Sequence, residues 1–178
     1  MISNNTVSTT QANTSGIILF SAAGGGTIDT VNIIDNQVST TGNAASAISI
    51  LHQTGAGITS NIIISGNTTN TTNTGAHGVT VATNAGTATN LAINDNTFTV
   101  ADLTSRGFII NTQPTSTICI SSFTGNTLNS TVALSADYDI EVQGMVNFVD
   151  FNNISVNNTN FNTGTENPVN SVNAVTGC

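Results

Sequence analysis

The stretch NLAINDNTFTV, residues 90–100, places a polar turn between two short apolar alternations. The alternating apolar positions are Leu91, Ile93, Phe98 and Val100. A period of two is typical of a β-strand, because successive strand side chains point to opposite faces. The residues after position 100 do not resemble the returning strand of a hairpin. The turn at Asp95 and Asn96 is therefore not expected to form a hairpin.

This stretch is one copy of a longer repeat. The aligned copies are ISNN (2–5), IIDN (33–36), ISGN (64–67), INDN (93–96), FTGN (123–126) and a weaker VDFN (149–152). The last Asn of the first five copies falls at positions 5, 36, 67, 96 and 126, so the repeat recurs at a nearly constant step. In four copies a small residue lies eleven positions after that Asn and precedes another apolar alternation. Those small residues are Gly16, Ala47, Gly78 and Gly107.

The step of about 30 residues lies within the range of about 20–50 residues that indicates a solenoid or another stacked array. Each unit here carries three short strand signals and no helical periodicity, which favours one coil of a parallel β-helix per unit. Successive coils stack about 4.8 Å apart. We therefore expect an all-β, right-handed parallel β-helix of about six coils with about 30 residues per coil. It is expected to form a single domain over residues 1–178, with residues 157–178 as a cap or polar tail.

In such a coil the turn bends the chain around a corner onto the next face. A sharp corner needs left-handed backbone, which Gly, Asn and Asp adopt at the lowest cost. Positions 4, 35, 66, 95 and 125 accordingly hold only these residue types. The Asn that follows each corner is expected to stack on its equivalents and exchange amide hydrogen bonds in a ladder. The predicted ladder comprises Asn5, Asn36, Asn67, Asn96, Asn126 and Asn152.

Composition narrows the range of partners. Charged residues make up 6% of the chain, and nine acidic residues against a single Arg give a net charge of −8. This balance argues against nucleic acid and against an anionic membrane surface as partners. No segment approaches the roughly 18–20 apolar residues of a membrane span, and no signal peptide is visible. Abundant Ile, Val and Thr favour a folded β-protein over a disordered one. We expect an exported protein, extracellular or at the cell surface.

The pattern Ile/Phe-x-x-Asn, followed eleven residues later by a small residue and Ile or Val, resembles the repeats of exported right-handed β-helix proteins. It is similar in particular to autotransporter passengers, including chlamydial polymorphic membrane proteins, whose repeats pair FxxN with GGA(I/L/V). A literal FxxN occurs at residues 123–126. The pairs Gly16-Ile17, Ala47-Ile48 and Gly78-Val79 correspond loosely to the second motif. The resemblance covers nearly the whole chain and implies this fold and an adhesive role.

Many β-helix proteins degrade polysaccharides, and such an enzyme needs a recognisable set of catalytic residues. A lyase of uronic acids needs a cationic base, or Ca²⁺ held by carboxylates, and Arg106 is the only candidate base. Asp137, Asp139 and Glu141 alternate and are candidates for a Ca²⁺ site or a glycosidase carboxylate pair, the alternative being a solvated strand edge. The two histidines have no partner in sequence and are interpreted as loop residues. We expect no enzymatic activity, no metal and no cofactor, and we retain a polysaccharide lyase or hydrolase as a second alternative.

A binding face is predicted on the strand after each corner. The residues one and three positions after each ladder Asn should point outward and form an uncharged array, interrupted at Gln37. Its members are Thr6, Ser8, Ser39, Thr68, Asn70, Thr97, Thr99, Thr127 and Asn129. Thr rows on β-solenoids resemble the ice-binding faces of antifreeze proteins, and the same array suits a neutral glycan. The alternative is that Thr occupies exposed strand positions for its β propensity alone.

The ends of the coil stack bear on assembly. Terminal strands of a β-helix have unpaired edges that recruit partners unless they are capped. No cap precedes Ile2, which suggests either a piece of a longer solenoid or head-to-tail stacking into a filament. Cys119 and Cys178 are close to two coils apart in sequence, which places them about 9–10 Å apart on equivalent azimuths. Because a disulfide requires Cα atoms within about 7 Å, Cys119 is predicted to be a small core residue and Cys178 to crosslink subunits or be inert.

Together these features predict a non-enzymatic structural or adhesive module of an exported bacterial surface protein or extracellular fibre. The expected partners are further copies of the chain, neighbouring coils of a longer chain, or a host receptor or glycan. The alternative is a solenoid that binds ice or a neutral glycan through its Thr/Ser/Asn array.

Overall fold

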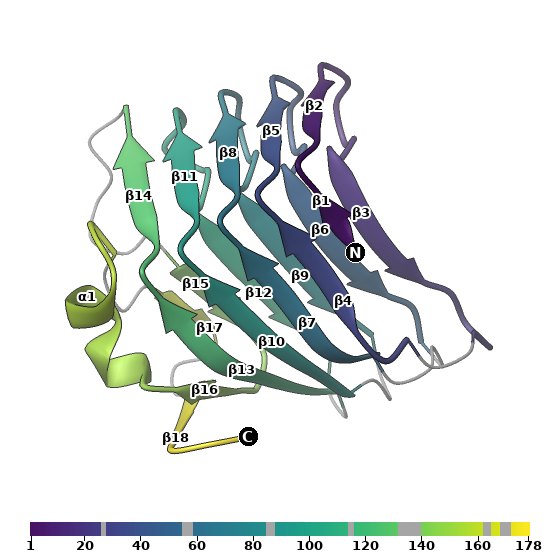
Figure 1. Ribbon diagram of the computed structural model, residues 1–178, viewed down its shortest axis with the longest axis vertical. Coiled ribbons are helices and arrows are strands. Elements are labelled where there is room, and N and C mark those ends of the chain that lie inside the picture. Colours follow the sequence, from purple (N-terminus) through teal and green to yellow (C-terminus); the bar gives the residue numbers. More distant parts are fainter. Residues whose placement is uncertain are drawn as a thin grey trace.

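Three parallel sheets extend along the molecule in the computed structural model (Figure 1). The structure describes residues 1–25, 28–54, 59–84, 88–113, 116–131, 140–161, 165–167 and 172–178. Within these ranges sheet A has the strand order β1 (Ile2–Ser3), β4 (Val31–Ile34), β7 (Thr59–Ser65), β10 (Ala88–Asn94), β13 (Thr117–Thr124), β16 (Val146–Val149), β18 (Val172–Val175). Sheet B has the order β2 (Thr6–Thr9), β5 (Gln37–Thr40), β8 (Thr68–Thr71), β11 (Thr97–Val100), β14 (Thr127–Ser130). Sheet C has the order β3 (Ile17–Ser21), β6 (Ile48–His52), β9 (Val79–Thr83), β12 (Phe108–Thr112), β15 (Ile140–Gln143), β17 (Thr165–Asn167).

Consecutive strands of the chain enter different sheets, and each strand pairs in parallel with the equivalent strand of the next coil. Ile2 pairs with Ile33 in sheet A, Thr6 with Gln37 in sheet B, and Ile17 with Ile48 in sheet C, so all three sheets keep the same register. The result is an all-β parallel solenoid of about five turns with about 30 residues per turn. The predicted fold class is confirmed, and the right-handed sense of the coil stays a prediction.

Rows of identical or similar apolar residues fill the interior. In sheet A, Ile33, Ile64 and Ile93 occupy successive rungs and are fully buried. Sheet C stacks Val79 on Phe108 in the same way. Full burial of each such side chain stabilises the fold by about 1.5–3 kcal/mol relative to exposure. The three-strand periodicity of the sequence thus corresponds to three inward rows around one core.

The corner between sheets A and B has the predicted left-handed backbone. Asp35 and Asp95 have φ of 56° and 58°, and Gly66 between them has φ of 67°. Glycine is also required there sterically, because a Cβ at Gly66 would collide with the Asp35 carboxylate on the neighbouring rung. Gly125 stands in the same relation to Asp95. The alternation of Asp and Gly along this corner therefore leaves room for each aspartate side chain. It also means that no two carboxylates occupy adjacent rungs.

The asparagine ladder follows this corner, and its last member differs from the prediction. Asn5, Asn36, Asn67, Asn96 and Asn126 stack as expected, each donating its side-chain amide to the Oδ1 of the next at 2.9–3.0 Å. The sixth position is held by Asn158, whose Oδ1 accepts from the backbone N–H and the Nδ2 of Asn126. The assignment of Asn152 to the ladder is wrong, because Asn152 is exposed in the 3₁₀ turn Phe151–Asn153.

Helical residues are inserted at this last corner. The 3₁₀ turn and the short helix α1 (Ile154–Asn157) lie between β16 and Asn158, at the far end of the stack from the N-terminal coil (Figure 1). Phe161, which follows, packs edge-on against Phe98 and Phe123 with ring centroids 5.9 and 5.3 Å apart. Aromatic packing of this kind closes the core at the C-terminal end.

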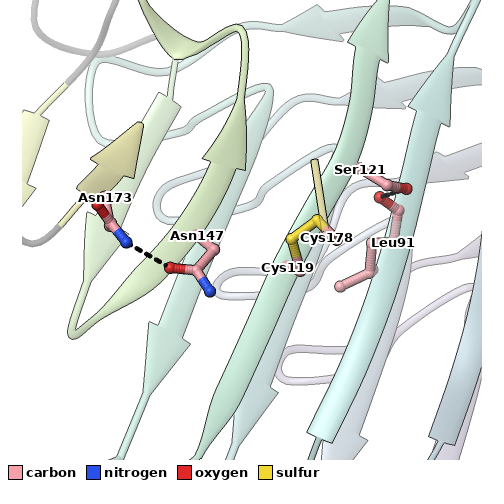
Figure 2. Close-up of a disulfide and its surroundings, with 6 residues drawn as sticks. All are labelled: Leu91, Cys119, Ser121, Asn147, Asn173 and Cys178. Carbon is pink, nitrogen blue, oxygen red and sulfur yellow. Dashed lines mark hydrogen bonds between the residues drawn. A yellow bond between two sulfur atoms is a disulfide. The ribbon is translucent and has the colours of Figure 1, made fainter. Parts of the chain in front are cut away.

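Cys119 and Cys178 form a disulfide, with Cα atoms 6.0 Å apart (Figure 2), so the predicted separation is wrong. Cys119 lies between the inward-facing Ile118 and Ile120, and its side chain is on the outer face of sheet A. Its strand β13 is two strands away from β18. The prediction placed Cys178 on an equivalent azimuth, whereas the last three residues return from β18 across β16 and reach β13.

Candidate binding surface

The outward face of sheet B carries two straight rows of uncharged polar side chains. Strand pairing aligns Thr6, Gln37, Thr68, Thr97 and Thr127 in the first row and Ser8, Ser39, Asn70, Thr99 and Asn129 in the second. The alternate residues of each strand face the core, among them the fully buried Phe98. All nine residues of the predicted array are therefore brought together on one face, which we call the sheet B face. Its role in binding stays a prediction.

The polar groups of this face are available for a ligand. Among the described residues, the side chains of the nine array members neither donate nor accept a hydrogen bond. Rungs lie about 4.8 Å apart, and the two rows lie about 6.6–6.8 Å apart along each strand. A shallow depression of about 180 Å³ on β2, β5 and β8 is lined by both rows. Hydroxyls and amides supply both donors and acceptors, so this surface is suited to a neutral ligand rich in hydroxyl groups.

The array is not a uniform Thr lattice. Gln37 interrupts the first row, and Asn70 and Asn129 interrupt the second. These side chains are longer than Thr and reach further from the sheet, so the face is uneven at three of its five rungs. Such unevenness favours a flexible polymer over a flat crystalline surface.

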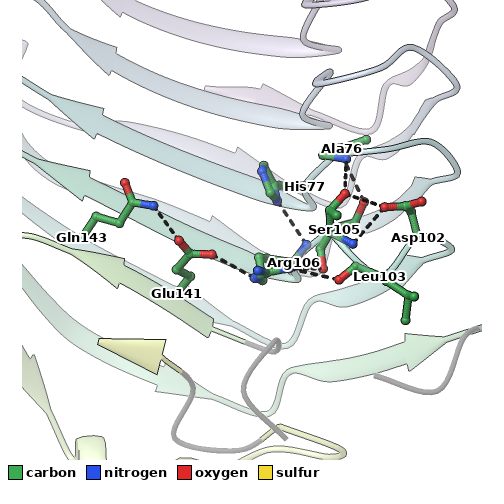
Figure 3. Close-up of polar contacts among 10 residues, drawn as sticks. Ala76, His77, Asp102, Leu103, Ser105, Arg106, Glu141 and Gln143 are labelled. Atoms are coloured by element: carbon green, nitrogen blue, oxygen red, sulfur yellow. Dashed lines mark hydrogen bonds and ion pairs between the residues drawn. The ribbon is translucent and has the colours of Figure 1, made fainter. Parts of the chain in front are cut away.

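A second polar cluster lies on the outer side of sheet C, where Figure 3 shows Arg106 between His77 and Glu141. Arg106 Nε donates to Glu141 Oε2 at 3.0 Å, and Gln143 Nε2 donates to Glu141 Oε1. The side chains of Arg106 and Glu141 are only 12% and 17% exposed. The candidate base of a lyase is thus held in an ion pair. Asp137 and Asp139, the other members of the predicted carboxylate trio, lie outside the described residues.

His77 lies in the connection before β9, as predicted, but it has a partner and belongs to this cluster. Its Nδ1 accepts a hydrogen bond from the Arg106 backbone N–H at 3.1 Å, so the neutral ring carries its proton on Nε2. Burial, and to a smaller extent the Arg106 charge, lower the pKa of His77 to about 4, and the Glu141 charge partly opposes them. His77 is therefore neutral near pH 7.

His77 predicts a specific acid sensitivity. Its folded pKa of about 4 lies below the unfolded value near 6.5, so the unfolded chain binds the proton first as pH falls. The contribution of neutral His77 to the free energy of unfolding is fully present above pH 6.5 and is lost as pH falls toward 4. We expect His77 to account for about 1 kcal/mol of lost unfolding free energy at pH 5.5. Urea titrations of the wild type and His77→Gln at pH 7.5 and 5.5 isolate this contribution, and equal losses in both proteins would contradict it.

His52 was also predicted to lie in a loop, and this is wrong. It is the last residue of β6 and is 3% exposed. It pairs with Ser21 and Thr83 in a buried polar row of sheet C, and burial lowers its pKa. The alternation of Ile48, Ile50 and His52 was the sequence signal for this inward position.

The remaining acidic residues do not converge. Within the described ranges, no three His, Cys, Asp or Glu side chains are placed to hold a metal ion. Asp102 instead accepts hydrogen bonds from the backbone N–H and hydroxyl of Thr104, which lower its pKa.

No described helix is long and apolar enough to cross a membrane. Thus the sheet B face has the most regular arrangement of available polar groups.

Comparisons with known proteins leave the family open. No family model, curated protein or solved structure matches the chain significantly. The fold-level part of the sequence resemblance, a parallel solenoid of stacked coils, is present in the structure. Its identification with autotransporter passengers or polymorphic membrane proteins stays a hypothesis.

Proposed function

We propose that the chain is a non-enzymatic structural and adhesive module of an exported protein, and that it contacts a neutral glycan through the sheet B face. The observation that carries this proposal is the pair of in-register, uncharged rows whose side-chain donors and acceptors are not used within the described fold. Parallel rungs hold these groups on a rigid scaffold. A glycan laid along the solenoid axis meets an uncharged hydroxyl or amide group of each row at every rung.

Other features support export and a neutral partner. A disulfide persists in oxidising compartments, including the cell exterior and the periplasm. The net charge of −8 disfavours polyanions such as polyuronates. The resemblance to autotransporter-type repeats agrees with a surface location. The ion-paired Arg106 gives no support to a lyase, and the interruptions of the Thr rows give none to ice binding.

Retention on insoluble polysaccharides tests the glycan contact. The wild type is expected to bind at least one of two neutral amorphous matrices, acid-swollen cellulose and colloidal chitin, and not an insoluble polyuronate at the same ionic strength. The double variant Thr68→Val/Thr97→Val removes two hydroxyls from one row with little change of shape. We expect it to weaken retention at least fivefold.

The matched control is Ser65→Ala, which removes an outward hydroxyl from sheet A. It should bind as the wild type does. Failure of the wild type to bind either neutral matrix, or equal retention of the double variant, would refute the glycan contact.

We also propose that the N-terminal coil stacks against a further solenoid coil, from a neighbouring stretch of chain or another copy. β1, β2 and β3 end their sheets, and Ile2, Val7 and Leu19 are only partly buried there, although equivalent residues of later coils are fully buried. Unpaired strand edges with apolar neighbours favour added strands. Electron microscopy across salt concentrations should show end-to-end assemblies of the purified chain. Single particles at every salt concentration would count against stacking of copies.

A further inference from the structure

We propose that the Cys119–Cys178 disulfide is a redox latch that holds β18 on sheet A, so that its reduction releases the C-terminal strand without unfolding the solenoid. The inference goes beyond the proposed function and does not depend on it. Figure 2 shows the bond on the outer face of the sheet, where Cys178 lies against β13. The latch therefore ties the chain end to a strand with which β18 itself does not pair.

The noncovalent hold on β18 is weak compared with that on the inner strands. β18 pairs with β16 alone among the described strands, whereas β13 lies between β10 and β16. Val172 and Val175 are only partly buried, and Asn173 and Ala174 are exposed. By contrast, Ile118 and Ile120 of β13 are 1% and 0% exposed. Little apolar burial thus opposes the entropy gained when the terminal strand detaches.

A side-chain hydrogen bond adds to the backbone pairing. Asn173 Nδ2 donates to Asn147 Oδ1 at 2.9 Å, and this contact is exposed to water (Figure 2). An exposed neutral hydrogen bond contributes little net stability, since water replaces it readily. The disulfide therefore adds a covalent restraint to a strand that is otherwise held by its pairing with β16 and by the partly buried Val172.

The position of the bond suits reduction from solution. Cys178 is exposed at the end of the chain, whereas Cys119 is 8% exposed against the sheet. A dithiol such as dithiothreitol attacks the Cys178 sulfur as a thiolate and displaces the Cys119 thiolate, which takes up a proton. The second thiol of the reagent then displaces Cys178, giving two protein thiols and one cyclic disulfide of the reagent.

Release of β18 uncovers a strand edge. β16 loses its only described partner on that side, and Val172 and Asn173 leave the wall of a cavity of about 340 Å³ that they share with Val146 and Asn147. An uncovered edge of this kind accepts another strand. The oxidised protein thus presents β18 at the C-terminal edge of sheet A, and the reduced protein presents the edge of β16.

Hydrogen exchange of the full chain, oxidised and treated with dithiothreitol, tests the latch. We expect the β18 amides that pair with β16 to exchange at least tenfold faster after reduction, while β7 and β10 amides change less than twofold. The variant Cys119→Ser/Cys178→Ser should match the reduced protein with and without the reagent. Unchanged β18 exchange would overturn the proposal. Equal acceleration of β7 and β10 would also overturn it, because the bond would then stabilise the whole fold rather than latch one strand.

Assembly provides a separate readout that does rest on the proposed stacking. If reduction accelerates β18 exchange and also lengthens the assemblies seen by electron microscopy, both proposals are supported. If exchange accelerates and no assembly forms under either condition, the latch stands and the stacking of copies fails.

Discussion

Asn96→Ala is expected to lower the free energy of unfolding by about 3–5 kcal/mol. Asn96 is 1% exposed and sits in the middle of the ladder. Its Nδ2 donates to the carbonyls of Ile64 and Asn94, and to the next ladder Oδ1. Its Oδ1 accepts from both the backbone N–H and the Nδ2 of Asn67.

The cost is large because the groups left behind are buried. Without the Asn96 side chain, three groups each lose a hydrogen-bond partner at a position that water reaches poorly. They are the backbone N–H and the side-chain amide of Asn67, and the carbonyl of Ile64. Each buried unsatisfied group costs about 1–3 kcal/mol. Urea denaturation of the two proteins measures the difference.

Two variants serve as controls for Asn96→Ala. Asn152→Ala changes an exposed residue outside the ladder and should alter stability by less than about 0.5 kcal/mol. Asn5→Ala removes the exposed first member and should cost about 1 kcal/mol, because water can replace its contacts. A loss at Asn96 no larger than that at Asn5 would contradict a cooperative buried ladder.

Gly78→Ala is expected to cost about 2–4 kcal/mol through overpacking. Gly78 lies at the entry to β9, in the row of small residues predicted from the repeat. A Cβ there would lie 2.6 Å from both the Gly107 carbonyl oxygen and the Phe98 ring, and 3.2 Å from Thr69 Oγ1. One of these neighbours is backbone and another is a fully buried ring, so neither can move without disturbing adjacent rungs.

Gly24→Ala separates this steric effect from backbone preference. Gly24 has φ of 71° and nothing within 4 Å of the position that a Cβ would take, so only left-handed strain applies, about 1 kcal/mol. Thermal and urea unfolding of both variants should therefore show the larger loss for Gly78→Ala. The reverse order would mean that the corner before β9 is looser than the structure shows.

The sequence was sufficient to predict the fold class, because every level of the pattern agreed. Apolar alternation marked the strands, left-handed residue types marked the corner, and the interval between Asn residues set the rungs in register. The sheet B face followed directly from that register, since residues one and three after each ladder Asn must share a side of the strand. Its chemistry was visible in the residue types alone.

Local similarity and spacing point to different residues for the last ladder position. VDFN matches the motif but places Asn152 several residues too early after Asn126, compared with the nearly constant step between the earlier ladder members. Asn158 lies 32 residues after Asn126 and completes the circuit once the helical insertion is included. A strand circuit needs a nearly constant length, so spacing is the stronger signal.

The disulfide and the His77–Arg106–Glu141 cluster could not be predicted with the same rules. Cys178 follows the last strand, and no repeat constrains the path of a tail. The cluster joins residues 29 and 35 apart, and its hydrogen bond to the His77 ring comes from a backbone N–H that has no sequence signature.

The most direct test of the asparagine-cornered solenoid is side-chain amide exchange, followed by NMR after transfer of the protein to D₂O. The ladder predicts that the Nδ2 protons of Asn36, Asn67, Asn96, Asn126 and Asn158 persist long after those of exposed asparagines, including Asn152, have vanished. Loss of all asparagine side-chain signals within minutes would contradict the ladder, as would protection of Asn152 in place of Asn158.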